Sequence, residues 1–246
     1  MPAPLKRLVT AAIVTGVSIA AAGCAGSSTP QPTATHQASA PPATFSAPPI
    51  QASGQRPAEQ PPAGYRWAGS SAQGIWVAIP KTWVALNLAK LSLSQVTKRF
   101  ATTGIGTTAM QADLANLKKQ DALFFADLAS YVTSAHGFTT NASALCTPAT
   151  AIEPGAAGIA GLQAAMRAEY AKLKARVLSV APVSVAGGQA FAAKLALTST
   201  AGFDITELQV VILSSTGHSC FVTFSTDDAA AFLHTFGKAA ATIHVG

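Results

Sequence analysis

The hydrophobic and polar positions divide the chain into three stretches. An apolar run covers Leu8 to Ala22, and a stretch from Ala25 to Pro62 has almost no large apolar side chains. Apolar positions recur from Tyr65 to the end, with the spacings that helices and strands with one buried face require. We therefore expect a signal segment over residues 1–23, a disordered tether over 24–63 and a single folded domain over 64–246.

The first half of the domain is predicted to open with a β-hairpin. Aromatic and β-branched runs at 65–68 and 75–79 flank a turn-rich segment, and Pro80 ends the second run. A strand at 122–126 is favoured, although continuation of a preceding helix through Leu128 stays open. The other expected elements are an apolar segment at 84–88, a short helix at 93–100 starting near Ser92 or Ser94, a helix from Thr107 through Leu117, a mobile loop at 130–140 and a strand at 142–146.

The second half is predicted to contain one long helix, a run of strands and a closing helix. Apolar residues step by three or four from Ile159 to Val177, which predicts a helix at 157–177. Strands follow at 178–185, 189–198, 203–213 and 218–225, separated by glycine-containing turns. Asp227 and Asp228 follow the hydroxyls of Ser225 and Thr226, which is typical of a capped helix start. That helix is expected to bury Phe232, Phe236 and Ala240, with a final strand at 242–245.

The N-terminus has the pattern of an export signal. Lys6 and Arg7 precede an apolar run that is short for a membrane span, and this run ends in Ala21-Ala22-Gly23-Cys24. This ending resembles the lipobox of bacterial lipoproteins, which implies cleavage before Cys24, lipidation of its sulfur (palmitate among the acyl groups) and attachment to the cell membrane on its extracytoplasmic face. Ala21 stands where that pattern usually has Leu or Val. Ordinary cleavage after Ala22, which would release a secreted protein, is the alternative.

The stretch after the signal is expected to stay unfolded. Nine prolines fall among the 38 residues from Ala25 to Pro62, and Phe45 and Ile50 are the larger apolar side chains there. Such a segment cannot bury enough surface to offset its chain entropy. It would span about 35 Å as a flexible coil and up to roughly 120 Å as polyproline helix. A lipid-anchored domain that must clear an envelope layer has a use for such a tether, which favours the lipoprotein interpretation.

Composition excludes some classes of function. The chain is 49% hydrophobic and 11% charged, which argues against wholesale disorder. The net charge of +6 falls to +4 once Lys6 and Arg7 leave with the signal. The denser basic group, Arg167, Lys172, Lys174 and Arg176, lies on the predicted long helix and lacks interleaved aromatic residues, so we expect no nucleic-acid partner.

Cys146 and Cys220 are the cysteines of the folded domain. An exported chain reaches an oxidising compartment, where two thiols allow one intramolecular disulfide with one connectivity. Two buried free thiols are the alternative. We favour the disulfide because exposed thiols would be a redox liability in that compartment.

The order of elements is similar to that of a known family. Three segments carry the resemblance: Ile79-Pro80-Lys81-Thr82-Trp83, residues 183–190, and Phe221 to Ser225 leading into Phe232 and Phe236. The chain resembles the PsbP-like α/β sandwich, and in particular actinobacterial lipoproteins of the LpqN type. The resemblance implies an α+β fold, an antiparallel sheet flanked by helices in an α/β/α sandwich, that serves as a binding or assembly module without an agreed catalytic residue set.

Candidate chemistry is sparse. The five histidines do not form a zinc-ligand spacing, and no cofactor fingerprint occurs, so we expect neither a metal nor a cofactor. A Ser-His-Asp hydrolase stays formally open because a triad can assemble from distant segments, but no nucleophile-elbow motif is present. Asp227 and Asp228 are interpreted as a helix cap rather than a catalytic pair.

Three tryptophans, Trp67, Trp76 and Trp83, lie within 17 positions at the start of the domain. Cross-strand packing explains them most simply. If exposed, they would form a patch for an envelope protein, a glycan or a lipid. We therefore expect a non-enzymatic, membrane-anchored binding or scaffolding module. A carrier of a hydrophobic ligand and an envelope hydrolase are the alternatives.

Overall fold

The computed structural model describes residues 55–88, 92, 95, 115, 117–148, 156–199 and 202–246. The helices and strands within these residues follow one another along the chain in this order: β1 (Tyr65–Ser70), β2 (Ile75–Pro80), β3 (Val84–Asn87), β4 (Leu123–Ala126), α4 (Ser130–Thr133), β5 (Asn141–Pro148), α5 (Ala156–Lys172), β6 (Arg176–Val185), β7 (Gly188–Thr198), β8 (Asp204–Ser214), β9 (His218–Thr226), α6 (Ala229–Ala240) and β10 (His244–Val245).

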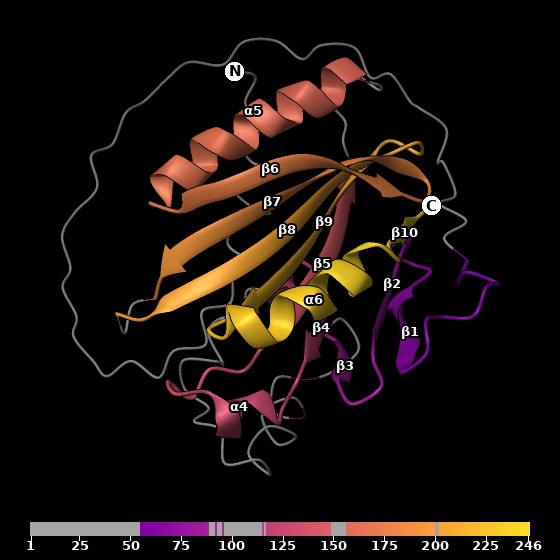
Figure 1. Ribbon diagram of the computed structural model, residues 1–246. Coiled ribbons are helices and arrows are strands. Elements are labelled where there is room, and N and C mark those ends of the chain that lie inside the picture. Colours follow the sequence, from indigo (N-terminus) through magenta and orange to yellow (C-terminus); the bar gives the residue numbers. More distant parts are fainter. Residues whose placement is uncertain are drawn as a thin grey trace.

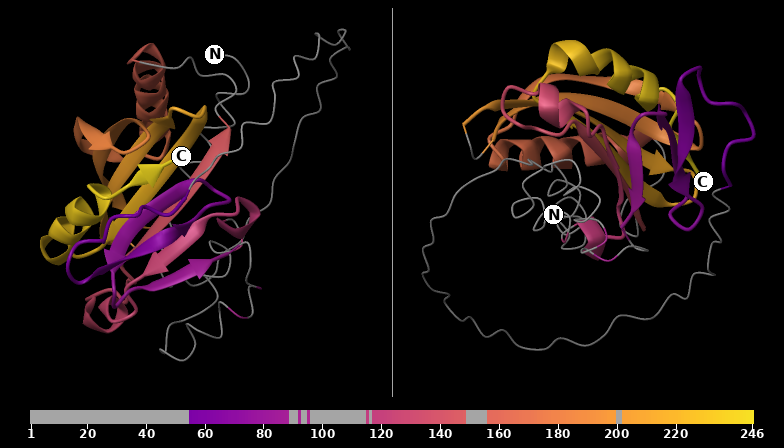
Figure 2. Two further views of the ribbon diagram at one scale, coloured as in Figure 1. Left: turned by 90° about the vertical axis from the view of Figure 1, so that its right-hand side faces the viewer. Right: turned by 90° about the horizontal axis from the view of Figure 1, so that it is seen from below.

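The strands form two antiparallel sheets. The larger has the order β3-β4-β5-β9-β8-β7-β6, and the smaller has the order β1-β2-β10. Helix α5 lies against one face of the larger sheet, whereas α6 and the smaller sheet lie against the other (Figure 1). Figure 2 shows the larger sheet strongly curved, with α5 on its inner side and α6 on its outer side. The predicted fold class, α+β with an antiparallel sheet flanked by helices, is confirmed.

Each face of the larger sheet carries its own hydrophobic core, because side chains alternate between the two faces along every strand. We call them the α5 face and the α6 face. On the α5 face, Leu162, Met166 and Tyr170 of α5 pack on Phe191, Val211 and Phe221. On the α6 face, Phe236 and Ala239 of α6 and Ile75, Val77 and Ile79 of β2 pack on Val210, Ile212, Val222 and Phe224.

The predicted disulfide between Cys146 and Cys220 is present. The two residues are directly opposed in neighbouring strands β5 and β9, with their Cα atoms 4.0 Å apart. Cys220 is buried on the α6 face. The bridge therefore joins two central strands of the larger sheet across a sequence separation of 74 residues.

The turn between β6 and β7 shows why Gly187 is required. Its φ of +88° lies in the region that favours glycine, and a Cβ atom there would stand 1.7 Å from the carbonyl oxygen of Val245. The neighbouring Ala186 donates its N–H to Ile243 and accepts from the N–H of Val245. The turn thus brings β10 beside the end of β6.

The helix predicted at 157–177 is shorter than expected, and this prediction is wrong at its C-terminal end. Helix α5 ends at Lys172, Lys174 has a φ of +56°, and Ala175 N–H donates to the Tyr170 carbonyl oxygen. This is a Schellman-type ending, and β6 begins two residues later. Leu173 and Val177 continue the apolar spacing but are 46% and 38% exposed, so that part of the stripe is not a buried helix face.

The segment 130–140 is also more ordered than the predicted mobile loop. It contains the one-turn helix α4, and Phe138, Thr139 and Thr140 are fully buried. The hydroxyl of Ser134 accepts the N–H groups of His136 and Phe138, which supplies local partners to the backbone of the loop. Hydrogen bonds from short polar side chains therefore stabilise this segment, and the spacing of hydrophobic residues does not reveal such bonds.

The remaining elements match their predictions closely, with one group left untested. The helices predicted at 93–100 and from Thr107 lie mostly outside the described residues. Ser92 and Gln95 exchange the reciprocal hydrogen bonds of a capping box, as expected for a helix starting near Ser92. In α6, Asp228 is the N-cap and accepts from Ala231 N–H. Phe236 and Ala239 are its buried residues, whereas Phe232 and the predicted Ala240 are only partly buried.

Candidate functional site: a pocket between two open strand edges

The structure brings two of the three tryptophans together. Side chains of opposed residues share a face, and β1–β2 pairing sets Trp67 opposite Ala78 and Gly69 opposite Trp76. Trp67 and Trp76 therefore stand on the outer face of the smaller sheet, and both are half-buried. The Trp76 ring lies over Gly69, where a Cβ atom would come within 2.7 Å of it. Trp83 is instead 3% exposed and lies edge-on to Phe236 in the α6-face core.

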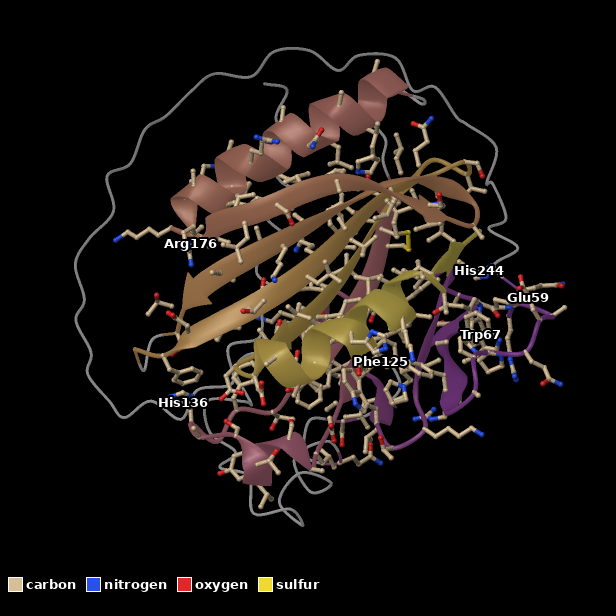
Figure 3. All side chains as sticks on the ribbon, viewed as in Figure 1. Glu59, Trp67, Phe125, His136, Arg176 and His244 are labelled. Carbon is tan, nitrogen blue, oxygen red and sulfur yellow. A yellow bond between two sulfur atoms is a disulfide. The ribbon has the colours of Figure 1, made fainter. Side chains whose placement is uncertain are left out.

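Trp67 holds the segment that leads into the domain. Its indole Nε1 donates to the carbonyl oxygen of Glu59 at 2.8 Å, and its ring lies edge-on to His244 with ring centroids 5.4 Å apart. The His244 Nε2 atom is 3.8 Å from the Glu59 carboxylate. Figure 3 shows these three residues clustered beside β1 and β10. The last residues before the domain are thus attached to the smaller sheet at this point.

Strand β1 presents unpaired backbone groups along its outer edge. Within the described part of the chain it is a terminal strand of the smaller sheet and pairs with β2 alone. Lys81 N–H donates to the Gly64 carbonyl oxygen, so Gly64 belongs to a hydrogen-bonded pair. Because such pairs alternate along an antiparallel ladder, the N–H and C=O of Trp67 and Gly69 point away from β2.

Strand β3 presents a second open edge in the same way. Among the residues that the structure describes, it is a terminal strand of the larger sheet and pairs with β4 alone. Asp127 N–H donates to the Thr140 carbonyl oxygen, so Phe125 directs its backbone groups to β5 and Phe124 directs its own to β3. Ala85, opposite Phe125, therefore directs its N–H and C=O away from β4.

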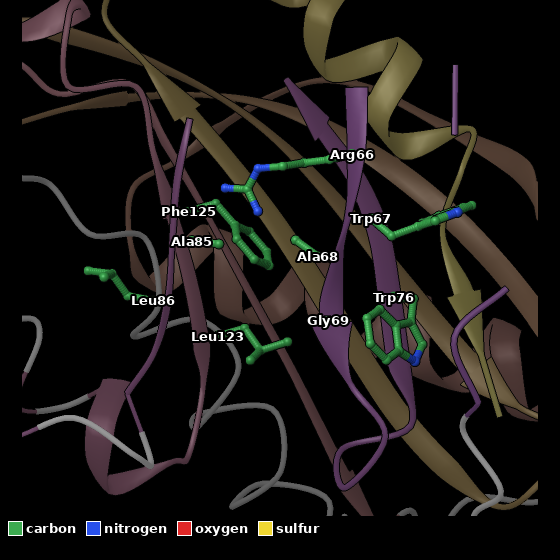
Figure 4. A pocket seen from close by; sticks show the side chains of 9 residues that line it. All are labelled: Arg66, Trp67, Ala68, Gly69, Trp76, Ala85, Leu86, Leu123 and Phe125. Carbon is green, nitrogen blue, oxygen red and sulfur yellow. The ribbon is translucent and has the colours of Figure 1, made fainter. Parts of the chain in front are cut away.

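The two open edges line one pocket of about 240 Å³, which we call the seam pocket. Its walls are contributed by Arg66, Trp67, Ala68, Gly69, Trp76, Ala85, Leu86, Leu123 and Phe125. Figure 4 shows β1 and β3 on opposite sides of this space, with Ala68, Leu123 and Phe125 between them. The outward backbone groups of Trp67, Gly69 and Ala85 explain why these residues reach the pocket. The pocket therefore combines an apolar inner wall with backbone donors and acceptors on both sides.

Arg66 is the charged residue among the nine that line the seam pocket. Its side chain extends from β1 toward Phe125 (Figure 4), and its Nη2 donates to the Trp83 carbonyl oxygen at 2.6 Å. This hydrogen bond fixes the position of the guanidinium group. A guanidinium carries five N–H donors, so the group retains donors for an anionic ligand. The site can thus bind a carboxylate next to an apolar surface.

A second polar cluster lies on the α5 face and was missed by sequence analysis. Glu207 and Gln209 of β8, Thr223 and Ser225 of β9 and Tyr170 of α5 are all buried. Tyr170 donates its hydroxyl to Gln209 Oε1, Gln209 Nε2 donates to Thr223, and Ser225 donates to Glu207 Oε1 at 3.0 Å. A detectable signal was the alternation in β8, which puts Glu207 and Gln209 on the same face as the apolar Ile205 and Val211.

Burial controls the ionisation of this cluster. Removal from water raises the pKa of Glu207 to about 7, and the hydrogen bond from Ser225 opposes this shift. Burial, together with the nearby Glu207 carboxyl group, raises the pKa of the Tyr170 hydroxyl. The cluster therefore holds a carboxyl group that is protonated in slightly acidic solution.

Asp227 connects the end of β9 to the 134–138 loop. Its carboxylate accepts from the Ser134 hydroxyl and lies 3.1 Å from His136 Nδ1, and the His136 ring stacks on Phe203. The Ser134 hydroxyl donates to Asp227 rather than to the histidine, so these three residues do not form a nucleophile–base pair. Asp228 is the helix cap, as predicted, whereas Asp227 holds the loop.

Two further observations concern only the part of the chain that the structure describes. No group of three or more His, Cys, Asp or Glu side chains is arranged to hold a metal ion there. The helices found in those residues are all too short or too polar to cross a membrane.

Comparison with known proteins yields similarity to solved structures alone. No family model and no curated protein matches the chain. Cyanobacterial PsbP from Synechocystis is similar at 13% identity and a TM-score of 0.44, covering 75% of this chain and 94% of that one. The Ran-binding protein Mog1p from Saccharomyces cerevisiae is similar at 8% identity and a TM-score of 0.42, covering 74% and 95%. A Pseudomonas aeruginosa protein of unknown function is similar at 15% identity and a TM-score of 0.35, covering 42% and 71%. These likenesses concern the fold and carry no argument about function.

Proposed function

We propose that this protein is a lipoprotein of the LpqN type, anchored through Cys24 to the extracytoplasmic face of a bacterial cell membrane. Its domain would be a PsbP-like binding or scaffolding module that performs no catalytic step. The observation that carries the binding role is the seam pocket, where Arg66 stands beside an apolar wall and two open strand edges. A pocket of this composition can hold a partner without any reacting group.

Three features of the chain support the anchored, exported location. The signal-like N-terminus ends at Cys24, and a proline-rich stretch separates that cysteine from the first strand. The Cys146–Cys220 disulfide is a feature typical of proteins that mature in an oxidising compartment. Trp67 and His244 attach the end of the proline-rich stretch to the smaller sheet.

The alternatives receive less support from the described residues. A carrier of a hydrophobic ligand needs a cavity of roughly 300–1,000 Å³ that encloses its ligand. The seam pocket measures about 240 Å³, and the charged Arg66 side chain lines it. A hydrolase needs a nucleophile hydrogen-bonded to a base, and Ser134 donates to Asp227 instead of His136. The Thr216 hydroxyl lies 3.3 Å from His218 Nδ1, but it also contacts the Ser214 hydroxyl in the turn between β8 and β9. The binding module is therefore the function that the geometry favours.

Acyl labelling tests the anchor. Bacteria expressing the chain are fed an alkyne-bearing fatty acid, and the protein is examined for label and for presence in the membrane fraction. We expect label on the wild type and on Ser27→Ala, which alters a nearby residue of the tether, and none on Cys24→Ala. Equal labelling of the wild type and Cys24→Ala, or an unlabelled wild type free in the medium, would refute the anchor.

Photocrosslinking in intact cells tests the binding role. A photoreactive phenylalanine analogue replaces Trp76 at the rim of the seam pocket, or Val132 of α4 as a control that is 78% exposed and does not line the pocket. We expect a discrete crosslinked product from position 76 that is absent from position 132. No product from position 76, or the same products from both positions, would contradict a binding role for this surface.

A further inference from the structure

We propose that the seam pocket binds an extended, carboxylate-bearing segment of a partner protein as an additional β-strand. This inference rests on the proposed binding role and specifies the partner. In this mode of recognition, main-chain hydrogen bonds to an open sheet edge provide affinity, and pockets for alternate side chains provide selectivity. The seam pocket contains both components, because strand edges border it and Arg66 and Phe125 line it.

The main-chain component comes from the outward groups of the two edge strands. Trp67 and Gly69 on β1, and Ala85 on β3, each direct an N–H and a C=O away from the paired strand, as their pairing registers require, and all three residues line the seam pocket. An extended peptide has donors and acceptors at the same two-residue repeat. Position 69 has no room for a side chain, since a Cβ atom there would come within 2.3 Å of the Ile75 carbonyl oxygen. A peptide strand can therefore pair along either edge.

The long edge at the other end of the larger sheet is built differently. Ser215 N–H donates to the Gly187 carbonyl oxygen, so Phe191 directs its backbone groups to β8 and Pro182, opposite Phe191, directs its nitrogen outward from β6. Proline there removes an outward donor, and a bulge between Val177 and Ser179 interrupts the same strand. Both devices protect sheet edges from pairing with other chains. The described residues of β1 and β3 contain neither proline nor bulge, so these edges remain competent to pair.

Charge complementarity identifies the side chain that the peptide must bring. Arg66 is the charged lining residue, and its guanidinium group is held in place by the Trp83 carbonyl oxygen. A carboxylate accepts from a guanidinium in a fixed geometry, which makes this pair stronger than a neutral hydrogen bond. Leu123 and Phe125 form the adjacent wall and favour an apolar side chain two positions away on the same face of the peptide.

The size of the pocket favours part of an extended chain over an entire small molecule. Sites that enclose drug-sized ligands measure roughly 300–1,000 Å³. At about 240 Å³, and bordered by two strands, the seam pocket accommodates a few consecutive residues whose chain continues beyond it. The occupant we infer is therefore a strand-forming segment with Asp or Glu next to an apolar residue.

Selection from displayed peptides tests the proposal. The full chain carrying Cys24→Ala is immobilised, and random ten-residue peptides displayed on phage are selected on it. We expect enriched peptides with Asp or Glu beside β-branched or aromatic residues and without proline at the centre. Peptides enriched without an acidic residue, or no enrichment at all, would overturn the proposal. Binding of octanoate at the pocket without any peptide binding would also overturn it, because a small carboxylate would then be the ligand.

Variants locate the binding and separate charge from folding. Arg66→Gln retains a donor for the Trp83 carbonyl oxygen but removes the charge, and we expect it to weaken binding of an enriched peptide about tenfold or more. Arg176→Gln removes an equal charge from the far edge strand β6 and should leave the affinity unchanged. Equal losses in both variants would show that binding depends on net charge alone and would overturn the proposal. Circular dichroism verifies that both variants fold.

Modified peptides test strand pairing directly. N-methylation removes one main-chain donor of the peptide without changing its side chains. Methylation at alternate positions should abolish binding in one series and spare it in the other, because only every second N–H faces the protein edge. Unchanged binding in both series would exclude pairing as a strand. A chain that binds such peptides but carries no lipid would refute the anchor and leave this inference intact, whereas a lipidated chain that binds none would refute the inference alone.

Discussion

The two faces of the larger sheet are built on different principles. On the α6 face, Phe224, Phe236 and Trp83 pack through their rings, and the Cys146–Cys220 bridge lies in the same layer. On the α5 face, the core of Leu162 and Met166 adjoins a buried polar cluster around Glu207. The α6 face can be apolar because its core serves only to pack α6 and the smaller sheet on the larger sheet. Burial of a carboxyl group lowers stability, so the Glu207 cluster offsets part of what the apolar core of the α5 face contributes.

The largest effect is expected from truncating the aromatic core of the α6 face. Phe236 is fully buried, with its ring 5.2 Å from that of Phe224. Phe236→Ala should lower the free energy of unfolding by about 3–5 kcal/mol, through lost burial and a cavity. Urea unfolding measures this loss. Phe232→Ala, at a partly buried position of the same helix, is the control and should cost clearly less. Similar losses in both variants would contradict a closely packed core at Phe236.

Removal of the disulfide should weaken the same face. In the double variant Cys146→Ala and Cys220→Ala, we expect the free energy of unfolding to fall by about 2–5 kcal/mol, since the bridge closes a long loop in the unfolded chain. Urea unfolding of this variant and of the wild type measures the difference. Alkylation of the unfolded wild type without reductant should label neither of these two cysteines. Labelling of both would mean that the native protein carries free thiols.

On the α5 face, Glu207→Gln should increase stability in a pH-dependent way. The pKa of Glu207 is about 7 in the folded protein, against 4.5 for a glutamate side chain in water. The wild type therefore loses stability as pH rises from about 4.5 to 7, because the unfolded chain releases the proton first. The loss reaches about 3 kcal/mol above pH 7 and is absent below pH 4. Glutamine cannot ionise, so the variant should lack this pH-dependent loss.

Unfolding in urea between pH 4 and pH 8 measures that difference. The variant's advantage over the wild type should grow with pH across this range and then level off. Asp204→Asn, which replaces an exposed carboxyl group at the start of β8, is the control and should show no comparable trend. A parallel pH dependence of the wild type and Glu207→Gln would show that Glu207 is ionised normally in the fold.

The smallest effect is expected for the link between α5 and the sheet. Tyr170→Phe leaves Gln209 Oε1 without its donor and should cost about 1–2 kcal/mol. Tyr131→Phe alters a partly buried tyrosine beside the same core, whose hydroxyl has no hydrogen bond among the described residues, and should be nearly neutral. Urea unfolding compares the two. An equal effect would mean that the Tyr170 hydroxyl contributes nothing specific to the attachment of α5.

Local chemistry explains which elements could be predicted from the sequence. The hairpin, the strands β6 to β9 and the capped helix α6 were predictable because residue alternation, turn residues and capping residues act over short range along the chain. The disulfide partners were predictable because two cysteines in an oxidising compartment allow only one pairing. The C-terminal end of α5 was not predictable, since Leu173 and Val177 extend a helical spacing into residues that a left-handed turn at Lys174 redirects. The order of the 134–138 loop was not predictable because it depends on Asp227, about ninety positions away in the chain.

The sequence by itself determined the classes of element, the export-like N-terminus and the grouping of tryptophans at the start of the domain. Only the tertiary structure decided that Trp83 enters the core while Trp67 and Trp76 stay at the surface, and that two strand edges from different sheets border one pocket beside Arg66. The physical reason is that sheet edges and pockets arise from how distant strands are ordered in space. Residue patterns along one strand specify which face of the strand is buried, but they do not specify whether the strand lies at the edge of its sheet.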